Sequence, residues 1–181
     1  MSQNHSFVLK FDRRYSMAHR LNSGVAPNCQ IPHGHDEVVS VEVAGSRDLD
    51  PDTNMLAEFS QVKGRWFDWV DRGVDHSFHL GESDPLIAYF QENEPHLLRK
   101  ILVTPGDPTT EIRAACFAAK MSAFLSKDNP GLECQSLTIQ ETPTNAVEFL
   151  PPNGRVVEDG NHRWWNRADL SINDFEAPQP S

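Results

Sequence analysis

Three closely spaced histidines are the residues of this chain whose types and spacing point most clearly to chemistry. His19 follows Ala18 in one segment, and His33 and His35 flank Gly34 in the next. A catalytic zinc is held by three protein ligands and keeps a further position for water or substrate, whereas a structural zinc has four protein ligands. No fourth ligand accompanies these histidines in the sequence, so the pattern favours metal-assisted catalysis over a structural zinc module.

The spacing of the histidines predicts how they meet. Side chains two residues apart in a strand project from the same face, so His33 and His35 can reach one ion if a strand begins there. Gly34 lacks a side chain and permits a close approach, and we expect His19, at the end of the preceding strand, to lie beside them in an antiparallel hairpin. Each histidine alone would more often be an ordinary surface residue, but the combined pattern favours zinc binding.

A cysteine in the loop before the second pair of histidines adds a candidate base or nucleophile. The thiolate is the reactive form of cysteine, and the polar neighbours of Cys29 argue against an inert buried thiol. Cys116 lies in an alanine-rich helical pattern and Cys134 precedes a strand, so we expect both to be structural. Three widely spaced cysteines do not form a disulfide framework, which favours a reducing, cytoplasmic location.

The dipeptide Asp75-His76 is a second candidate for proton transfer. A carboxylate can fix the tautomer of a histidine and raise the basicity of the ring. Adjacent side chains often point apart, so a hydrogen bond between these two within one chain stays an open question. The alternative is an aspartate that caps a helix beside a surface histidine.

Glu141 is unexpected on its strand face. It shares that face with Leu137 and Ile139, where an apolar residue would be expected, and a carboxylate there is costly unless it is paired. A carboxylate can accept two hydrogen bonds from the amidine-like edge of a heterocycle. The alternatives are a solvated strand end for Glu141 and, for Glu111, ordinary compensation of a helix dipole in the first helical turn.

Hydrophobic periodicity predicts the elements that must position these side chains. An apolar stripe at helical spacing, Met55, Phe59, Val62, Trp66 and Trp69, predicts an amphipathic helix whose tryptophans pack in the core. The other predicted elements are strands at 7–15, 38–44, 135–142 and 146–150, a helix at 109–125 and a brief strand at 101–103. Short connections between consecutive strands imply an α+β fold with a four-stranded antiparallel sheet and two helices in the order ββααββ.

Length and charge limit the domain organisation and the partners. The 181 residues predict one domain over 1–150 and a C-terminal extension over 151–181. The formal net charge of −10 argues against nucleic acid or an anionic membrane as a partner, and we expect neither a signal peptide nor a membrane span. The paired Trp164 and Trp165, flanked by arginines, predict that the extension packs at a subunit interface, the alternative being a partly ordered tail.

Five motifs in order resemble those of the 6-pyruvoyl-tetrahydropterin synthase / 6-carboxytetrahydropterin synthase family. They are Met17-Ala18-His19-Arg20-Leu21, Cys29-x-x-x-His33-Gly34-His35, Asp75-His76, Pro108-Thr109-Thr110-Glu111 and Gln140-Glu141-Thr142. The resemblance covers residues 7–150, and the three-residue spacer before His33 is similar to that of the 6-carboxytetrahydropterin synthase branch. It implies the tunnelling fold (T-fold), in which trimers close a barrel and two trimers stack into a hexamer.

The resemblance also implies a reaction and a role for each residue. The substrate would be 7,8-dihydroneopterin triphosphate, and a zinc lyase of queuosine biosynthesis would release 6-carboxy-5,6,7,8-tetrahydropterin, acetaldehyde and triphosphate. Two alternatives are triphosphate elimination alone, which yields 6-pyruvoyltetrahydropterin, and a non-catalytic zinc protein that binds a pterin or purine. The implied residues are His19, His33 and His35 as ligands of Zn2+, Cys29 as the base, Asp75 and His76 as a relay from a neighbouring subunit, Glu141 as the pterin anchor, and Thr109, Thr110 and Glu111 around that pocket.

The chain departs from the family pattern at several places. Asp36 and Glu37 stand where the family usually has a small polar residue and an aromatic one. Both would bring negative charge near a triphosphate unless they point away. The stretch 82–106 is long for the family, and neither this stretch nor the extension is explained by the resemblance.

Overall fold

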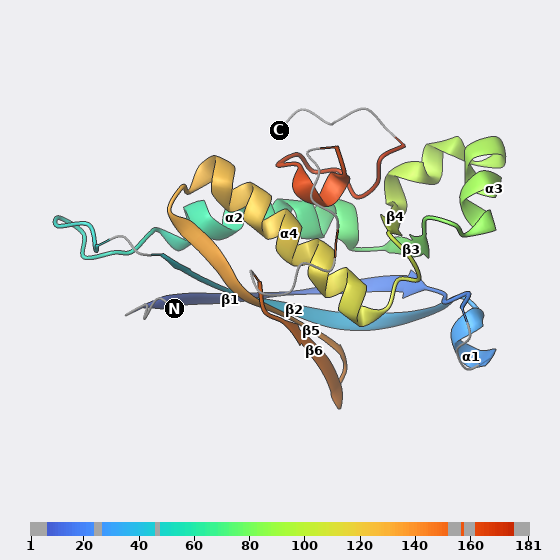
Figure 1. The fold of residues 1–181 in the computed structure, drawn as a ribbon, viewed down its shortest axis with the longest axis horizontal. Helices are drawn as coiled ribbons and strands as arrows, with labels where there is room; N and C mark the ends of the chain where they lie inside the picture. The colour runs from blue at the N-terminus through green and yellow to red at the C-terminus, as the bar shows by residue number, and fades with distance from the viewer. Residues whose placement is uncertain (1–6, 24–26, 46–47, 152–156, 158–161, 176–181) are drawn as a thin grey trace.

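The centre of the molecule is one sheet that carries its main helices on one face (Figure 1). A computed structural model describes residues 7–23, 27–45, 48–151, 157 and 162–175. Its strands are β1 (Val8–His19), β2 (His33–Gly45), β3 (Ser77–Gly81), β4 (Ile101–Thr104), β5 (Leu132–Thr142) and β6 (Asn145–Phe149). Its helices are α1 (Pro27–Gln30), α2 (Phe59–Trp69), α3 (Pro85–Asn93) and α4 (Thr110–Asp128), with shorter turns at Val70–Val74, Pro95–Lys100 and Trp164–Asn166.

The strand order confirms the α+β class and corrects the predicted strand count. The sheet has six strands in the order β4-β3-β1-β2-β5-β6, and β1, β2, β5 and β6 form the predicted antiparallel unit. The predicted sheet of four strands is wrong because β3 and β4 extend it in parallel beyond β1. β3 pairs with β1 only from Met17 to His19. The formation of β3 therefore depends on tertiary pairing, which no local sequence pattern predicts.

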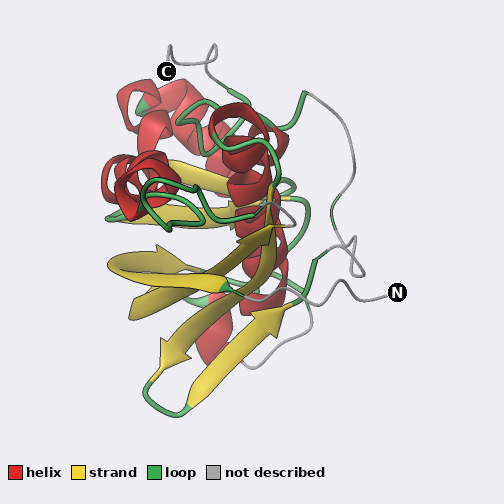
Figure 2. Cartoon of the chain, turned by 90° about the vertical axis from the view of Figure 1, so that its left-hand side faces the viewer, coloured by secondary structure: helices red, strands yellow, loops and turns green. Residues whose placement is uncertain are grey.

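Alternation along β1 and β2 divides one face of the sheet into an apolar end and a polar end. On β2 the buried valines Val39, Val41 and Val43 are followed, toward the start of the strand, by Glu37 and then by two of the histidines. Because side chains two residues apart share a face, the histidines lie on the same face as the core valines. Helices α2 and α4 cover that face (Figure 1), and the turned view shows helices packed against the strands (Figure 2).

The apolar stripe of the first predicted helix is confirmed from Val62 onward. Val62, Trp66 and Trp69 are buried in the core, as expected. The helix itself begins at Phe59, and Met55 lies in the loop before it with half of its surface exposed. The side chains before the helix therefore line a surface hollow instead of the core.

The described part of the C-terminal extension packs on the chain's own core. Trp164 stacks on Trp69 with ring centroids 6.0 Å apart, and its indole nitrogen donates to the carbonyl oxygen of Val103 at 2.7 Å. Trp164 and Trp165 are both buried within the chain, and packing of the extension at a subunit interface stays a prediction. The rest of the extension, apart from residues 157 and 162–175, lies outside the described residues.

A buried lysine of α4 fixes this part of the extension. The Lys120 ammonium is fully buried, donates to the carbonyl oxygens of Trp164 and Arg167 at 2.8 and 2.9 Å, and lies 3.3 Å from Asp169. Burial lowers the pKa of Lys120 to about 8, although Asp169 partly opposes the shift. An unfolded lysine keeps its proton to a higher pH, so the unfolded chain binds more protons than the folded chain above pH 8.

We therefore expect Lys120 to make the protein more stable as the pH rises from 7 to 9. Over this interval the wild type should gain about 1 kcal/mol of unfolding free energy relative to Lys120→Met, because the folded protein alone loses the buried charge. Urea unfolding of both proteins at the two pH values measures the difference. Titration of the buried cysteines is common to both proteins and cancels, and a difference that stays constant with pH would contradict the expectation.

Candidate metal centre

The hairpin of β1 and β2 brings the three histidines together. His19 and His33 are direct partners in the strand register, and His35 lies opposite Met17. One nitrogen from each ring lies within 4.8 Å of the other two, and the Nε2 atoms of His19 and His33 are 3.0 Å apart. A Cβ on Gly34 would come within 2.7 Å of the Met17 carbonyl oxygen, so glycine is required for this close approach.

The hydrogen bonds of the rings show that this group fits a cation. His19 Nδ1 lies 3.1 Å from the Pro108 carbonyl oxygen, and His33 Nδ1 lies 2.8 Å from that of Ile31. A carbonyl only accepts, so each Nδ1 carries the proton and, in neutral rings, each Nε2 presents a lone pair. Two lone pairs that face each other repel unless a cation lies between them, and outer carbonyls of this kind commonly orient metal-binding histidines.

The third ring and the local charge agree with this assignment. His35 Nε2 is buried and has no hydrogen-bond partner among the described residues. Burial, and then the positive charge of Arg113, lower the pKa of His19 to about 4, so this ring is neutral at neutral pH. The neutral imidazole is the form that binds a metal.

A buried ion pair lies next to the site and was not predicted from the sequence. Arg113 of α4 and Glu37 of β2 are both fully buried, and two hydrogen bonds of 2.6 and 2.9 Å join them. The Tyr15 hydroxyl donates to the same carboxylate at 2.6 Å. The sequence does contain a signal for this pair: an arginine on an apolar helix face and a glutamate in a valine-rich strand.

The two acidic residues that depart from the family pattern do not leave bare charge in the site. Glu37 is neutralised by Arg113, whereas Asp36 pairs with Arg14 on the exposed surface. Adjacent strand residues point to opposite faces, so the two carboxylates diverge. The expected conflict with an anionic substrate is therefore removed.

Glu141 lies between the triad and the buried ion pair. Its Oε1 atom is 3.7 Å from His35 Nε2 and 3.7 Å from Arg113 Nη2, and a quarter of its side chain is exposed. The register of β5 with β6 shifts between Gln140 and Thr142, which is the local irregularity that re-aims a side chain at a strand end. Glu141 is thus paired and directed toward the triad.

The start of α4 lies beside the triad through the Pro108 carbonyl. Thr109 caps the helix, and its hydroxyl accepts from the amide of Ile112 at 3.4 Å. The Thr110 hydroxyl accepts from Arg113 at 3.1 Å, and Glu111 is exposed in the first turn. The two threonines have structural partners, so a role for these residues at a substrate stays a prediction.

Cys29 lies in the one-turn helix α1, next to the ends of β1 and β2 (Figure 1). Its carbonyl oxygen accepts from the amide of Leu21 at 2.8 Å. Among the described residues, the group of potential metal ligands contains the three histidines and not this thiol. The structure therefore leaves Cys29 available for a role other than ligation.

Asp75 and His76 do hydrogen-bond within one chain. His76 Nδ1 lies 2.7 Å from Asp75 Oδ2, and the φ of +58° at His76 is the left-handed conformation that brings the adjacent side chains together. The Ser16 amide donates to Asp75 Oδ1, and the His76 amide donates to the Ser16 carbonyl. The dyad thus lies at the edge of β1, about 10 Å along the strand from His19, and its imidazole is exposed.

A fourth histidine beside the triad was not predicted. His79 of β3 is the register partner of His19 and is fully buried. The Ser77 hydroxyl donates to the Val74 carbonyl, so His79 Nε2 donates to that hydroxyl at 2.8 Å. His79 Nδ1 has no hydrogen-bond partner in the described part of the chain, and burial keeps the pKa of this ring well below its ordinary value.

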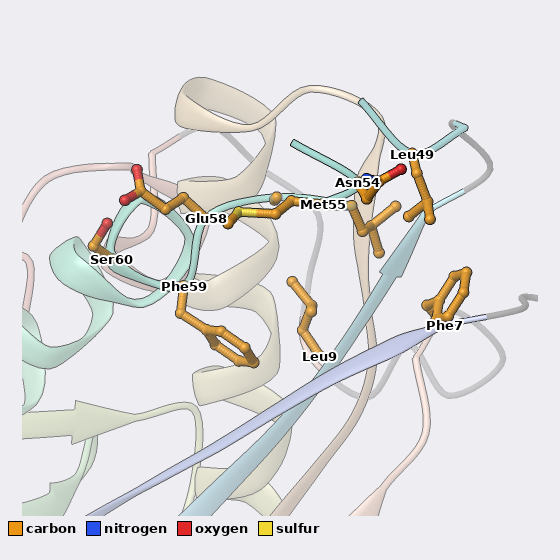
Figure 3. Close-up of a pocket in the computed structure, with 10 residues that line it drawn as sticks. Phe7, Leu9, Leu49, Asn54, Met55, Glu58, Phe59 and Ser60 are labelled. Carbon is orange, nitrogen blue, oxygen red and sulfur yellow. The ribbon is translucent and has the colours of Figure 1, made fainter. Parts of the chain in front are cut away.

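An apolar hollow lies at the opposite end of β1 and is separate from the triad. Its volume is about 520 Å³, and Phe7, Leu9, Met55 and Phe59 are among the side chains that line it (Figure 3). Leu9 and His19 are ten residues apart on one strand, a distance of roughly 33 Å. The hollow and the triad are therefore two separate places on the molecule.

Comparisons with known proteins define the class of the molecule. The family described as 6-pyruvoyl tetrahydropterin synthase matches residues 8–152. A 6-carboxy-5,6,7,8-tetrahydropterin synthase from Bacillus subtilis is 29% identical over 150 residues, which are 83% of this chain and 89% of the relative. A probable 6-carboxy-5,6,7,8-tetrahydropterin synthase from Halobacterium salinarum is 30% identical over 130 residues, which are 72% and 77% of the two chains.

Solved structures agree in fold. The 6-pyruvoyl tetrahydropterin synthase of Caenorhabditis elegans superposes with a TM-score of 0.54 at 23% identity, covering 83% of this chain and all 100% of that one. An uncharacterized protein from Wolinella succinogenes gives a TM-score of 0.60 at 22% identity, covering 81% and 100%. The chain belongs to the 6-pyruvoyl tetrahydropterin synthase family, and its fold is the expected T-fold. Every helix in the described residues is too short or too polar to cross a bilayer.

Proposed function

We propose that this protein is a zinc-dependent lyase that converts 7,8-dihydroneopterin triphosphate to 6-carboxy-5,6,7,8-tetrahydropterin, acetaldehyde and triphosphate, in queuosine biosynthesis. The observation that carries the proposal is the meeting of three histidine ring nitrogens at one point. In His19 and His33 the other ring nitrogen is hydrogen-bonded to a backbone carbonyl, which orients the ring. The names of the curated relatives and the three-residue spacer before His33 support the 6-carboxytetrahydropterin branch.

The residues of the site divide the chemistry among them. His19, His33 and His35 would hold zinc, which when bound supplies Lewis acidity to the side-chain oxygens of the substrate. The Glu141 carboxylate, 3.7 Å from Arg113, accepts hydrogen bonds from the N–H groups of the pterin edge. The Cys29 thiolate removes a proton from the substrate side chain.

The dyad of Asp75 and His76 provides the second proton-transfer group. Hydrogen bonding to the carboxylate keeps the proton on His76 Nδ1, so Nε2 is free to accept or return a proton. The exposed ring lies at the edge of β1, away from the triad of its own chain. This placement supports delivery of the dyad to the site of a neighbouring subunit.

The sheet edges support assembly into a trimer and then a hexamer. β3 covers β1 only from Met17 to His19, so among the described residues the 8–16 part of that edge has no strand partner. β6 forms the opposite edge, and exposed edges of this kind are open to pairing with another chain. Pairing of these edges would place the dyad at the subunit boundary. The free thiols of all three cysteines support a cytoplasmic location.

Product identification tests the proposed function. The purified protein is loaded with zinc and incubated with 7,8-dihydroneopterin triphosphate, and the products are identified by mass spectrometry. We expect 6-carboxy-5,6,7,8-tetrahydropterin and acetaldehyde. Formation of 6-pyruvoyltetrahydropterin without acetaldehyde would assign the elimination reaction instead, and zinc-loaded protein without turnover would support the non-catalytic pterin- or purine-binding alternative.

Replacing Cys29 separates catalysis from metal binding. We expect Cys29→Ala to lower turnover by about 10²- to 10⁴-fold, the usual contribution of a general base, and to leave zinc at about one per chain. Steady-state rates and metal analysis of the same preparation measure both quantities. Cys134→Ala, which alters a buried thiol at the start of β5, is the matched control and should retain turnover. Loss of zinc in Cys29→Ala would show that the thiol is a ligand and not the base.

A further inference from the structure

A buried carboxylate of the stretch 82–106, which we call the inserted stretch, holds the backbone directly after His19, the first proposed metal ligand. Arg20 donates to Asp84 through Nε at 2.8 Å and through Nη2 at 2.5 Å, and Asn22 adds a hydrogen bond of 2.8 Å. The Asp84 side chain is completely shielded from solvent. Two-pronged, charge-assisted pairs of this kind impose a definite geometry on both partners.

The same carboxylate begins the inserted helix. Asp84 is the N-cap of α3, and its Oδ1 atom accepts from the Leu86 amide at 2.8 Å. Burial alone would raise the pKa of Asp84, but the hydrogen bonds from Arg20, Leu86 and Asn22 outweigh burial and hold the pKa below its ordinary value. The charged carboxylate therefore joins the inserted helix to the segment that follows His19.

A second carboxylate, directly after the stretch 82–106, holds Asn22 and Ser23. Asp107 accepts from the amide of Asn22 at 3.0 Å through Oδ1 and from the amide of Ser23 at 2.7 Å through Oδ2. The next residue, Pro108, accepts from His19 Nδ1 at 3.1 Å. Pro108 thus orients the ring of His19, and Asp107 holds the backbone of residues 22–23.

Cys29 is connected to the same segment. Leu21 lies between Arg20 and Asn22, which are both held, and its amide donates to the Cys29 carbonyl at 2.8 Å. Hydrogen bonds therefore join Asp84 and Asp107 to the backbone segment 20–23, and a further hydrogen bond joins that segment to the helix turn that carries the thiol.

We propose that Asp84 and Asp107 are positioning residues that hold residues 20–23 and thereby keep Cys29 beside the metal ligands. The inserted stretch, which the family resemblance left unexplained, then has a defined purpose at the site. The importance of Cys29 rests on the proposed function, but the positioning itself rests only on the contacts described above.

The test uses the alkylation rate of Cys29 in the intact protein. Site-resolved mass spectrometry follows iodoacetamide labelling in the wild type, Asp84→Asn and Asp107→Asn, because an amide has one acceptor oxygen where the carboxylate uses two. We expect Cys29 to react about tenfold faster in Asp107→Asn, since losing a charge-assisted hydrogen bond favours local opening by about that factor. Asp84→Asn should act in the same direction.

Internal and external controls separate positioning from general stability. Cys116 and Cys134 are buried and report opening of the core. Glu82→Gln removes a charge from the same stretch, but Glu82 pairs with Arg163 at 3.3 Å, so this variant should label like the wild type.

Faster labelling of Cys29 with protection of the other two thiols would support the proposal. Unchanged labelling of Cys29 in both aspartate variants would overturn it, as would equal acceleration at all three cysteines. No substrate enters the experiment. An inactive enzyme would therefore leave this inference standing, and a failed labelling test would leave the proposed function standing.

Discussion

His33→Ala will lose its bound metal and about 10³-fold or more of its turnover. The variant removes one of the three proposed ligands, and a metal ion supplies several kcal/mol of transition-state stabilisation, which corresponds to a factor of this size. The lost imidazole also leaves His19 Nε2 without the group that lies 3.0 Å away. Metal content and steady-state turnover, measured on one zinc-loaded and desalted preparation, give both quantities.

His96→Ala is the matched control for this prediction. His96 is exposed in the Pro95–Lys100 turn and does not belong to the histidine group found among the described residues. The control should keep about one zinc per chain and wild-type turnover. Full zinc retention in His33→Ala would contradict the assignment of the triad, and so would more than a tenth of the wild-type rate.

Arg113→Met is expected to lower the unfolding free energy by about 3–5 kcal/mol. The substitution leaves the fully buried Glu37 carboxylate without its partner, and an uncompensated buried charge carries a cost of about this size. Tyr15 can still donate one hydrogen bond to that carboxylate, but it cannot neutralise the charge. Urea unfolding at pH 7 measures the change.

Two further variants test the cause of this loss. Glu37→Gln/Arg113→Met removes both charges and should recover most of the stability, because no ion then remains buried. Arg14→Met breaks the neighbouring Arg14–Asp36 pair, which is exposed, so this variant should lose little stability. Equal losses in Arg113→Met and Arg14→Met would show that the buried pair has no special importance.

Local pattern was sufficient for the triad. Two histidines separated by one glycine at a strand start must share a face, and a hairpin must bring the end of the preceding strand beside them. The register pair of His19 and His33 confirms the hairpin, and the meeting of the three ring nitrogens confirms the shared face. The face of Glu141 was predictable for the same reason, whereas its direction toward His35 depends on a register shift and on Arg113, which lies on a distant helix.

Features that depend on tertiary context could not be predicted. The hydrogen bond between Asp75 and His76 requires a left-handed backbone at a residue other than glycine, which single-chain patterns do not predict. Trp164 was recognisable as a buried anchor, but its stacking on Trp69 could not be distinguished from packing against another subunit. The contacts of Asp84 join segments more than sixty residues apart, so the inserted stretch gave no local sign of its place beside the site.

X-ray absorption at the zinc edge tests the central claim most directly. For the zinc-loaded protein we predict three imidazole nitrogens at about 2.0–2.1 Å, completed by oxygen from water and without a sulfur shell near 2.3 Å. That result would place the metal on His19, His33 and His35 with a position open to substrate. A sulfur scatterer, four imidazoles, or a protein that retains no zinc would contradict the account.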